Sequence, residues 1–116
     1  MITIRTDVDL EQAMAGALDP GLRMLLSLRR SQLPGPLHEQ AHFIIVERGD
    51  SLAAVEKEAG YPLTVDAPPW DWVERHPGGW IEAPIITDDD GFAVIILARD
   101  CITTNPALLF ALRAHA

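Results

Sequence analysis

Two histidines and a glutamate form the most specific chemical pattern in the sequence. His38, Glu39 and His42 stand in the order H-E-x-x-H. On a helix, residues four apart share a face, so both imidazoles could bind one zinc ion while the glutamate activates a water molecule as general base. Zinc requires a further ligand, and Glu56 or Glu58 is a possible third one. The pattern therefore gives one functional hypothesis, a minimal zinc-dependent hydrolase.

The surroundings of this pattern favour a strand over the required helix. Pro34 and Pro36 precede it, and the run His42–Glu47 (HFIIVE) contains β-branched residues. These features predict a turn followed by a buried strand. The five letters resemble the motif of zinc metallopeptidases, whose longer form has a third histidine where Arg48 stands. We therefore expect a protein without catalytic residues or cofactor, and zinc hydrolysis remains the alternative.

The elements of the second half are organised around two apolar runs, Trp80–Thr87 and Phe92–Ala98. Asp88–Gly91 separates them and is typical of a hairpin loop. With those four residues as the loop, Thr87 pairs with Phe92, and the register follows outward. Both faces of the hairpin are then apolar, so helices, a second sheet or another subunit must cover both.

Several signals place the remaining elements. Pro84 cannot donate to a ladder, which predicts that its strand lies at the sheet edge and that the run after the loop lies inside. Ile2–Ile4 alternates like a short strand. Helix starts are indicated at Thr6 or Asp7, at Asp19-Pro20 and at Ser51, and Gly60 ends the third helix.

These elements predict a single α+β domain over residues 1–116, with a helical subregion at 7–33 and a sheet-containing region at 42–116. We expect a small antiparallel sheet built on the C-terminal β-hairpin, with the helices packed on it. In the second helix the Arg23–Arg30 cluster is expected to form a solvated polar face.

Composition narrows the class of protein. The 116 residues carry a net charge of −8, and the first 36 are balanced, with four acidic and four basic side chains. Because the protein is acidic overall, binding to the negatively charged phosphates of nucleic acid is disfavoured. An acidic mimic of nucleic acid, or a partner of a basic protein, is an alternative function. The single Cys101, the lack of a signal peptide and the lack of a run of about 18 apolar residues predict a cytoplasmic protein that does not enter membranes.

Aromatic and apolar residues supply the candidate interaction surface. Trp70, Trp72 and Trp80 surround a proline-rich segment, and Ile95 lies on the two-faced apolar hairpin. Large aromatic side chains either complete a core or anchor an interface. From these residues we expect a non-enzymatic interaction module that forms a homo-oligomer or binds a protein partner, whose identity the sequence does not give.

Two resemblances follow from longer stretches. Val46–Leu52, continued by Val55 and Gly60, looks like the first half of a lysin motif, which implies a glycan-binding module as a further alternative. The segments Ala41–Leu52 and Gly78–Asp100 resemble a family of short, acidic, uncharacterised bacterial proteins that is associated with plasmid and mobile-element regions. This second resemblance spans residues 19–116 and implies an α+β fold without a known activity.

Overall fold

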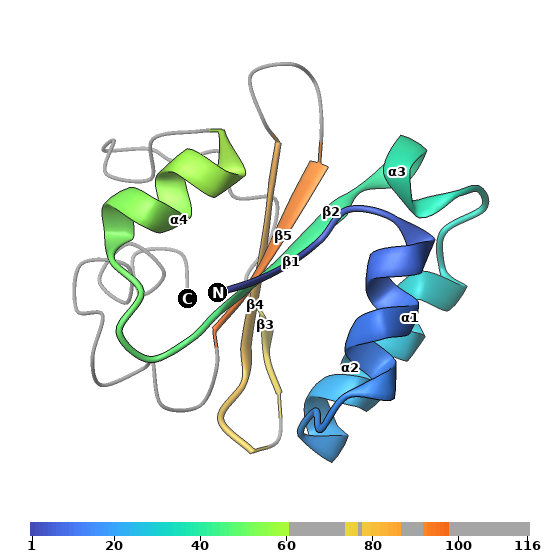
Figure 1. The fold of residues 1–116 in the computed structure, drawn as a ribbon, viewed down its shortest axis with the longest axis horizontal. Helices are drawn as coiled ribbons and strands as arrows, with labels where there is room; N and C mark the ends of the chain where they lie inside the picture. Colours follow the sequence, from blue (N-terminus) through green and yellow to red (C-terminus); the bar gives the residue numbers. More distant parts are fainter. Residues whose placement is uncertain (61–73, 77, 87–91, 98–116) are drawn as a thin grey trace.

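The computed structural model describes residues 1–60, 74–76, 78–86 and 92–97. Helices and strands follow one another as β1 (Ile2–Ile4), α1 (Asp7–Ala15), α2 (Pro20–Ser31), α3 (Leu37–Gln40), β2 (His42–Val46), α4 (Leu52–Ala59), β3 (Glu74–Arg75), β4 (Ile81–Ile86) and β5 (Phe92–Leu97). The strands form one sheet in the order β1-β2-β5-β4-β3 (Figure 1). The predicted α+β class is confirmed.

The sheet is mixed, so the prediction of a wholly antiparallel sheet was wrong. β2 and β5 run parallel, with Ile44 opposite Ile95, whereas the other neighbouring strands are antiparallel. The two parallel strands occupy the middle of the sheet. Their described side chains from Phe43 to Val46 and from Ala93 to Leu97 are buried without alternation. Continuous apolar runs of this kind are typical of strands covered on both faces.

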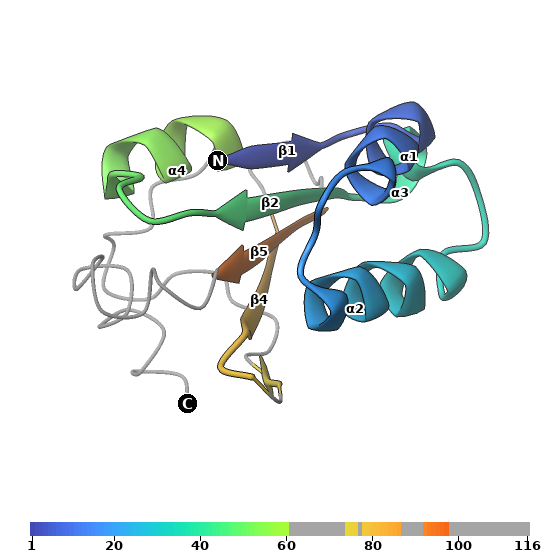
Figure 2. The ribbon, with the colours of Figure 1, turned by 60° about the horizontal axis from the view of Figure 1, so that its bottom comes forward.

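Helices cover both faces of the sheet, as the two-faced apolar hairpin predicted. Figure 1 shows the sheet nearly edge-on, with α4 on one side and α1, α2 and α3 on the other, and Figure 2 shows the strands between α4 and α2. On the α4 side, Val55 and Ala59 pack against Ile44 and Ile95. On the opposite side the core contains Leu10, Leu22, Leu25, Leu26, Leu37, Phe43, Trp80, Val94 and Ile96.

The register of β4 and β5 differs from the predicted one by a single residue. Ile86, not Thr87, is the partner of Phe92, so Ala83 lies opposite Ile95. A one-residue slip exchanges the faces of a strand, and Ile81 accordingly shares the α4 side with Leu97. The sequence could not distinguish these registers because both faces of each strand are apolar.

The prediction for the sheet edge was correct for β5 and wrong for β4. β5 is the central strand, whereas β3 adds a further strand outside β4. β3 is only two residues long and pairs with Ile81 and Glu82, so Pro84 lies beyond its end.

The helix starts lie where the cap signals predicted. Thr6 and Asp9 form a reciprocal capping box at α1, and the Asp19 carboxylate caps α2. Ser51 caps α4, and Gly60 ends it at φ 74°, a conformation that favours glycine. Among the described residues, no helix has the length and apolar character needed to cross a membrane.

One carboxylate joins the three helices of the α1 side. Asp7, at the start of α1, accepts hydrogen bonds from Arg30 Nε of α2 at 2.6 Å and from the backbone N–H of Leu37 at 3.1 Å. The Arg30 guanidinium, followed by the Leu37 N–H, lowers the pKa of Asp7 below its ordinary value. The charged carboxylate is therefore the form that the folded protein favours.

The register can be tested with cysteine pairs in a Cys101→Ser background. Ala83→Cys with Ile95→Cys should form a disulfide during oxidative refolding, because directly opposite residues on one face are close enough to bridge. Mass spectrometry would detect the loss of two hydrogen atoms. The control, Ala83→Cys with Ile96→Cys, should stay reduced. Oxidation of the control pair alone would favour the register that places Thr87 opposite Phe92.

Asp7 should contribute to the acid sensitivity of the fold. Because its pKa is lowered in the folded state, its stabilisation is present above the unfolded-state pKa and is lost as the pH falls through the folded-state value. Denaturant titrations at neutral pH and at about pH 3 should show a smaller loss of stability for Asp7→Asn than for the unchanged protein. Glu11→Gln, at an exposed position of the same helix, is the control and should keep the full loss.

Candidate functional site

Helix α2 is attached to β4 near both of its ends. At its N-terminus, Trp80 Nε1 donates a hydrogen bond to Asp19 Oδ2 at 3.1 Å. The same oxygen accepts from the backbone N–H of Gly21 at 3.0 Å. A Cβ atom at Gly21 would lie 3.1 Å from that oxygen and 3.5 Å from Trp80 Nε1. The glycine therefore permits the indole to approach the helix end closely.

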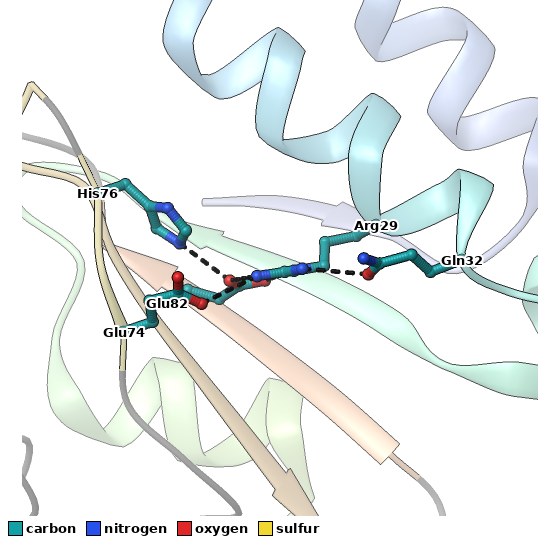
Figure 3. Close-up of polar contacts among 5 residues, drawn as sticks. All are labelled: Arg29, Gln32, Glu74, His76 and Glu82. Atoms are coloured by element: carbon teal, nitrogen blue, oxygen red, sulfur yellow. Dashed lines mark hydrogen bonds and ion pairs between the residues drawn. The ribbon is translucent and has the colours of Figure 1, made fainter.

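Near its C-terminus, α2 extends an arginine across the sheet to a buried glutamate (Figure 3). Arg29 Nε donates to Glu82 Oε2 and Arg29 Nη2 donates to Glu82 Oε1, each at 2.7 Å. This is the two-pronged geometry in which guanidinium and carboxylate fit best. The Glu82 side chain is 0% exposed and that of Arg29 is 17% exposed. Among the described residues Glu82 is the buried charged one.

Three further side chains complete this cluster. His76 Nε2 lies 3.0 Å from Glu82 Oε1. Arg29 Nη2 reaches Glu74 Oε2 at 3.1 Å, and Arg29 Nη1 donates to the Gln32 side-chain oxygen at 3.0 Å. Together the five residues form a polar cluster between α2, β4 and the segment that contains β3 (Figure 3).

The turn between β3 and β4 brings His76 over Glu82. Gly78 and Gly79 have φ values of 86° and 87°, in the region that side chains disfavour. The chain thus reverses tightly, and the His76 backbone N–H donates to the Trp80 carbonyl at 2.8 Å. The sequence Gly78-Gly79 is therefore the local reason that a histidine reaches a glutamate of the adjacent strand.

Electrostatics in the cluster centre on the guanidinium. The Glu82 carboxylate, partly opposed by desolvation and assisted by Glu74, raises the pKa of Arg29 above its ordinary value. Arg29 is therefore permanently charged and neutralises the buried carboxylate. A buried carboxylate without such a partner would be strongly unfavourable.

Glu74, His76 and Glu82 are also the group with metal-ligating side chains that lies close together in the described part of the chain. Their ligand atoms all fall within 4.8 Å of one another. Both Glu82 oxygens, however, already accept from Arg29, whose positive charge lies in the same place as a bound cation would. The guanidinium thus takes the role of the cation, and these residues do not fit a metal centre.

A partly open hollow adjoins the polar cluster on its α2 side. Its volume is about 120 Å³, and it lies between the end of α2 and the strands β2, β4 and β5. Its walls are formed by Arg29, Gln32, Leu33, Ala41, Phe43, Glu82 and Val94. Polar and apolar side chains thus converge here on a concave surface.

The residues of the H-E-x-x-H pattern do not share a helix. α3 contains His38 and Glu39 but ends at Gln40, and Ala41 is extended with φ −166° and ψ 169°. His42 is the first residue of β2, as the strand prediction required. The common helical face on which the zinc hypothesis depends is therefore not formed.

The two proposed third ligands for zinc lie on α4. Glu58 pairs with Arg5 at 2.8 Å, which lowers the pKa of Glu58, and His42 lies close enough to make a small electrostatic contribution. His38 and Glu39 are both exposed on α3, on the opposite side of the sheet (Figure 1). The structure therefore brings His42 near Glu58 but does not assemble the predicted set.

Two of the predicted surface residues belong to the core. Ile95 is buried under α4, and Trp80 is buried with its indole on Asp19. Their assignment to an interaction surface was wrong, because each has a covering helix within the same chain. Trp70 and Trp72 lie outside the described residues.

The sequence analysis missed the pair Arg29 and Glu82, although one signal was available. Glu82 is the only charged residue in the apolar run Trp80–Thr87. A charge that must be buried with its neighbours requires a partner of opposite sign. The run could thus have predicted a buried ion pair, but the sequence does not identify Arg29 as the partner, because the two lie 53 residues apart.

No family model matches this chain, and neither the curated proteins nor the solved structures contain a significant match to it. The strand, turn and helix from Val46 to Gly60 are explained by the Ser51 cap and the Gly60 end alone. The likenesses to the lysin motif and to short bacterial proteins remain predictions from the sequence.

Replacing one partner of the buried ion pair should destabilise the protein more than replacing both partners. Arg29→Met leaves the Glu82 carboxylate buried without its counter-ion and should lower the free energy of unfolding by about 3 to 5 kcal/mol. The double variant with Glu82→Leu should recover much of that loss, which urea titration would measure. Arg30→Met, at a more exposed ion pair, is the control and should cost much less. A double variant as unstable as the sum of the single variants would contradict the direct coupling.

Proposed function

We propose that this chain is a non-enzymatic interaction protein that self-associates through the outer face of α2. The observation that carries the proposal is an uncharged, partly apolar stripe on a helix of a strongly acidic protein. In this proposal the protein acts in the cytoplasm and requires no cofactor, nucleic acid or membrane. The polar cluster around Glu82 then serves to fix α2 on the sheet.

The outer stripe of α2 consists of Met24, Ser27, Leu28 and Ser31. These positions follow the spacing i, i+3, i+4, i+7, which places them on one helical face. All four are exposed, and Met24 and Leu28 are 74% and 49% exposed. Val8 of α1 is 61% exposed, and within the described residues these three are the exposed large hydrophobic side chains. All of them thus lie on the α1 and α2 side of the sheet.

The three arginines of α2 turn away from this stripe. Arg23 donates to the carbonyls of Met14 and Gly16 at the C-terminal end of α1, Arg29 binds Glu82, and Arg30 binds Asp7. Arg23 and Arg30 remain half-buried, so the expected face Arg23–Arg30 is partly solvated, but each of the three guanidinium groups has a partner within the chain. The surface between them carries no charge.

A second copy of the chain suits this stripe better than a charged partner does. In a two-fold interface the same patch meets itself, so a patch whose charges all have one sign would repel its copy. The net charge of −8 would repel a second copy, and a neutral stripe keeps that charge outside the contact. Ser27 and Ser31 are small enough for two helices to approach closely, with Met24 and Leu28 packed around them.

Charges placed on the stripe should abolish self-association. The unchanged protein should have a mass in solution of twice the 12.7 kDa of one chain, and raised salt should strengthen the dimer by screening repulsion. Met24→Glu with Leu28→Glu should give the single-chain mass by light scattering. Ala53→Glu with Lys57→Glu, on exposed positions of α4, is the matched control and should remain dimeric.

Two results would contradict this proposal. One is a single-chain mass for the unchanged protein at high concentration and at both low and high salt. The other is a dimer that persists in the Met24→Glu, Leu28→Glu variant, which would place the contact elsewhere. Circular dichroism of each variant would show that the fold is retained, since all the changed positions are exposed.

A further inference from the structure

The hollow under the end of α2 has a buried floor and an accessible rim. Phe43, Val94 and Glu82 are buried and form its floor. Gln32, Leu33 and Ala41 are exposed or half-buried and form its rim. The Phe43 ring and the Val94 methyl groups line a hollow whose volume is about 120 Å³. The floor is thus mainly hydrocarbon, and the hollow is reachable from the surface.

The polar groups beside the hollow bind one another. Nε and both terminal nitrogens of Arg29 donate to protein acceptors, namely Glu82, Glu74 and Gln32. Both oxygens of Glu82 accept from Arg29, and one also contacts His76. A carboxylate ligand would therefore find its natural partner, the guanidinium fork, already occupied. The hollow offers a ligand contact with hydrocarbon and no uncompensated charge.

We propose that this hollow binds a small uncharged molecule with an aromatic or branched aliphatic body. An apolar cavity of about 150 Å³ holds benzene and stays dry when empty, because water needs several polar partners. The volume here is close to that value, and the hollow is partly open to the surface. The proposal is independent of self-association, since the outer stripe of α2 takes no part in the lining.

Fluorobenzene is a suitable probe, because its fluorine signal reports the bound fraction directly by NMR. Titration into the unchanged protein should give saturable shifts of the methyl signals of Leu33 and Val94, which line the hollow. Benzoate has the same ring with a negative charge and should bind at least about tenfold more weakly, because the Arg29 guanidinium that lines the hollow is already paired with Glu82.

A larger side chain at the rim should block the site. Ala41→Leu places three additional carbons into the hollow and should weaken fluorobenzene binding by at least about tenfold. Ala53→Leu makes the same change on exposed α4 and should leave binding unchanged. If Ala41→Leu does not give a folded spectrum, Leu33→Phe at the half-buried rim replaces it.

Three results would overturn the proposal. The first is the absence of saturable shifts in the unchanged protein up to the solubility of fluorobenzene. The second is equal binding to the folded rim variant, which would place the ligand elsewhere. The third is benzoate binding as tight as that of fluorobenzene, which would show that the site selects an anion. Methyl shifts confined to Leu33 and Val94 and lost in the rim variant would support it.

Discussion

The buried pair of Arg29 and Glu82 is the interaction on which the arrangement of α2 depends. Glu82 is fully buried in a sheet whose neighbouring side chains are almost entirely apolar, so its charge requires a partner from another layer. Arg29 supplies that partner with two hydrogen bonds of 2.7 Å each. The pair need not add to net stability, because apolar residues could fill the same space. It does specify where the helix must lie, since an alternative placement would leave the carboxylate unpaired.

The attachment of α2 to the sheet also determines which of its side chains are exposed to solvent. Asp19 binds Trp80 at one end of the helix and Arg29 binds Glu82 near the other, which fixes its rotation as well as its position. With Leu25 and Leu26 directed to the core, Met24 and Leu28 must point outward. The exposed apolar residues are thus a consequence of satisfying an internal charge. The outer stripe of α2 is uncharged, and the three arginines of this helix bind partners elsewhere in the chain.

Local features of the fold could be predicted from the sequence, whereas pairings between distant segments could not. Caps at Thr6, Asp19 and Ser51 follow from hydrogen bonds within a few residues, and these were predicted correctly. The parallel pairing of β2 with β5 joins segments about fifty residues apart, and no local signal specifies its direction. The register between β4 and β5 was predicted wrongly for a related reason, because neither strand has a polar face that would mark its outer side. For the candidate site, the sequence could indicate only that Glu82 needs a partner. It could not identify that partner, because nothing local distinguishes Arg29 from the other arginines of α2.

The hollow and the outer stripe lie on different sides of the same helix, and this sets the thermodynamic relation between them. A ligand stabilises the folded chain by an amount that depends on its concentration relative to its dissociation constant. It changes self-association only if its affinity differs between the single chain and the dimer. Because α2 is tied to β4 near both ends, filling the hollow does not require the helix to move. The proposed ligand site and the proposed contact surface are therefore expected to act independently of each other.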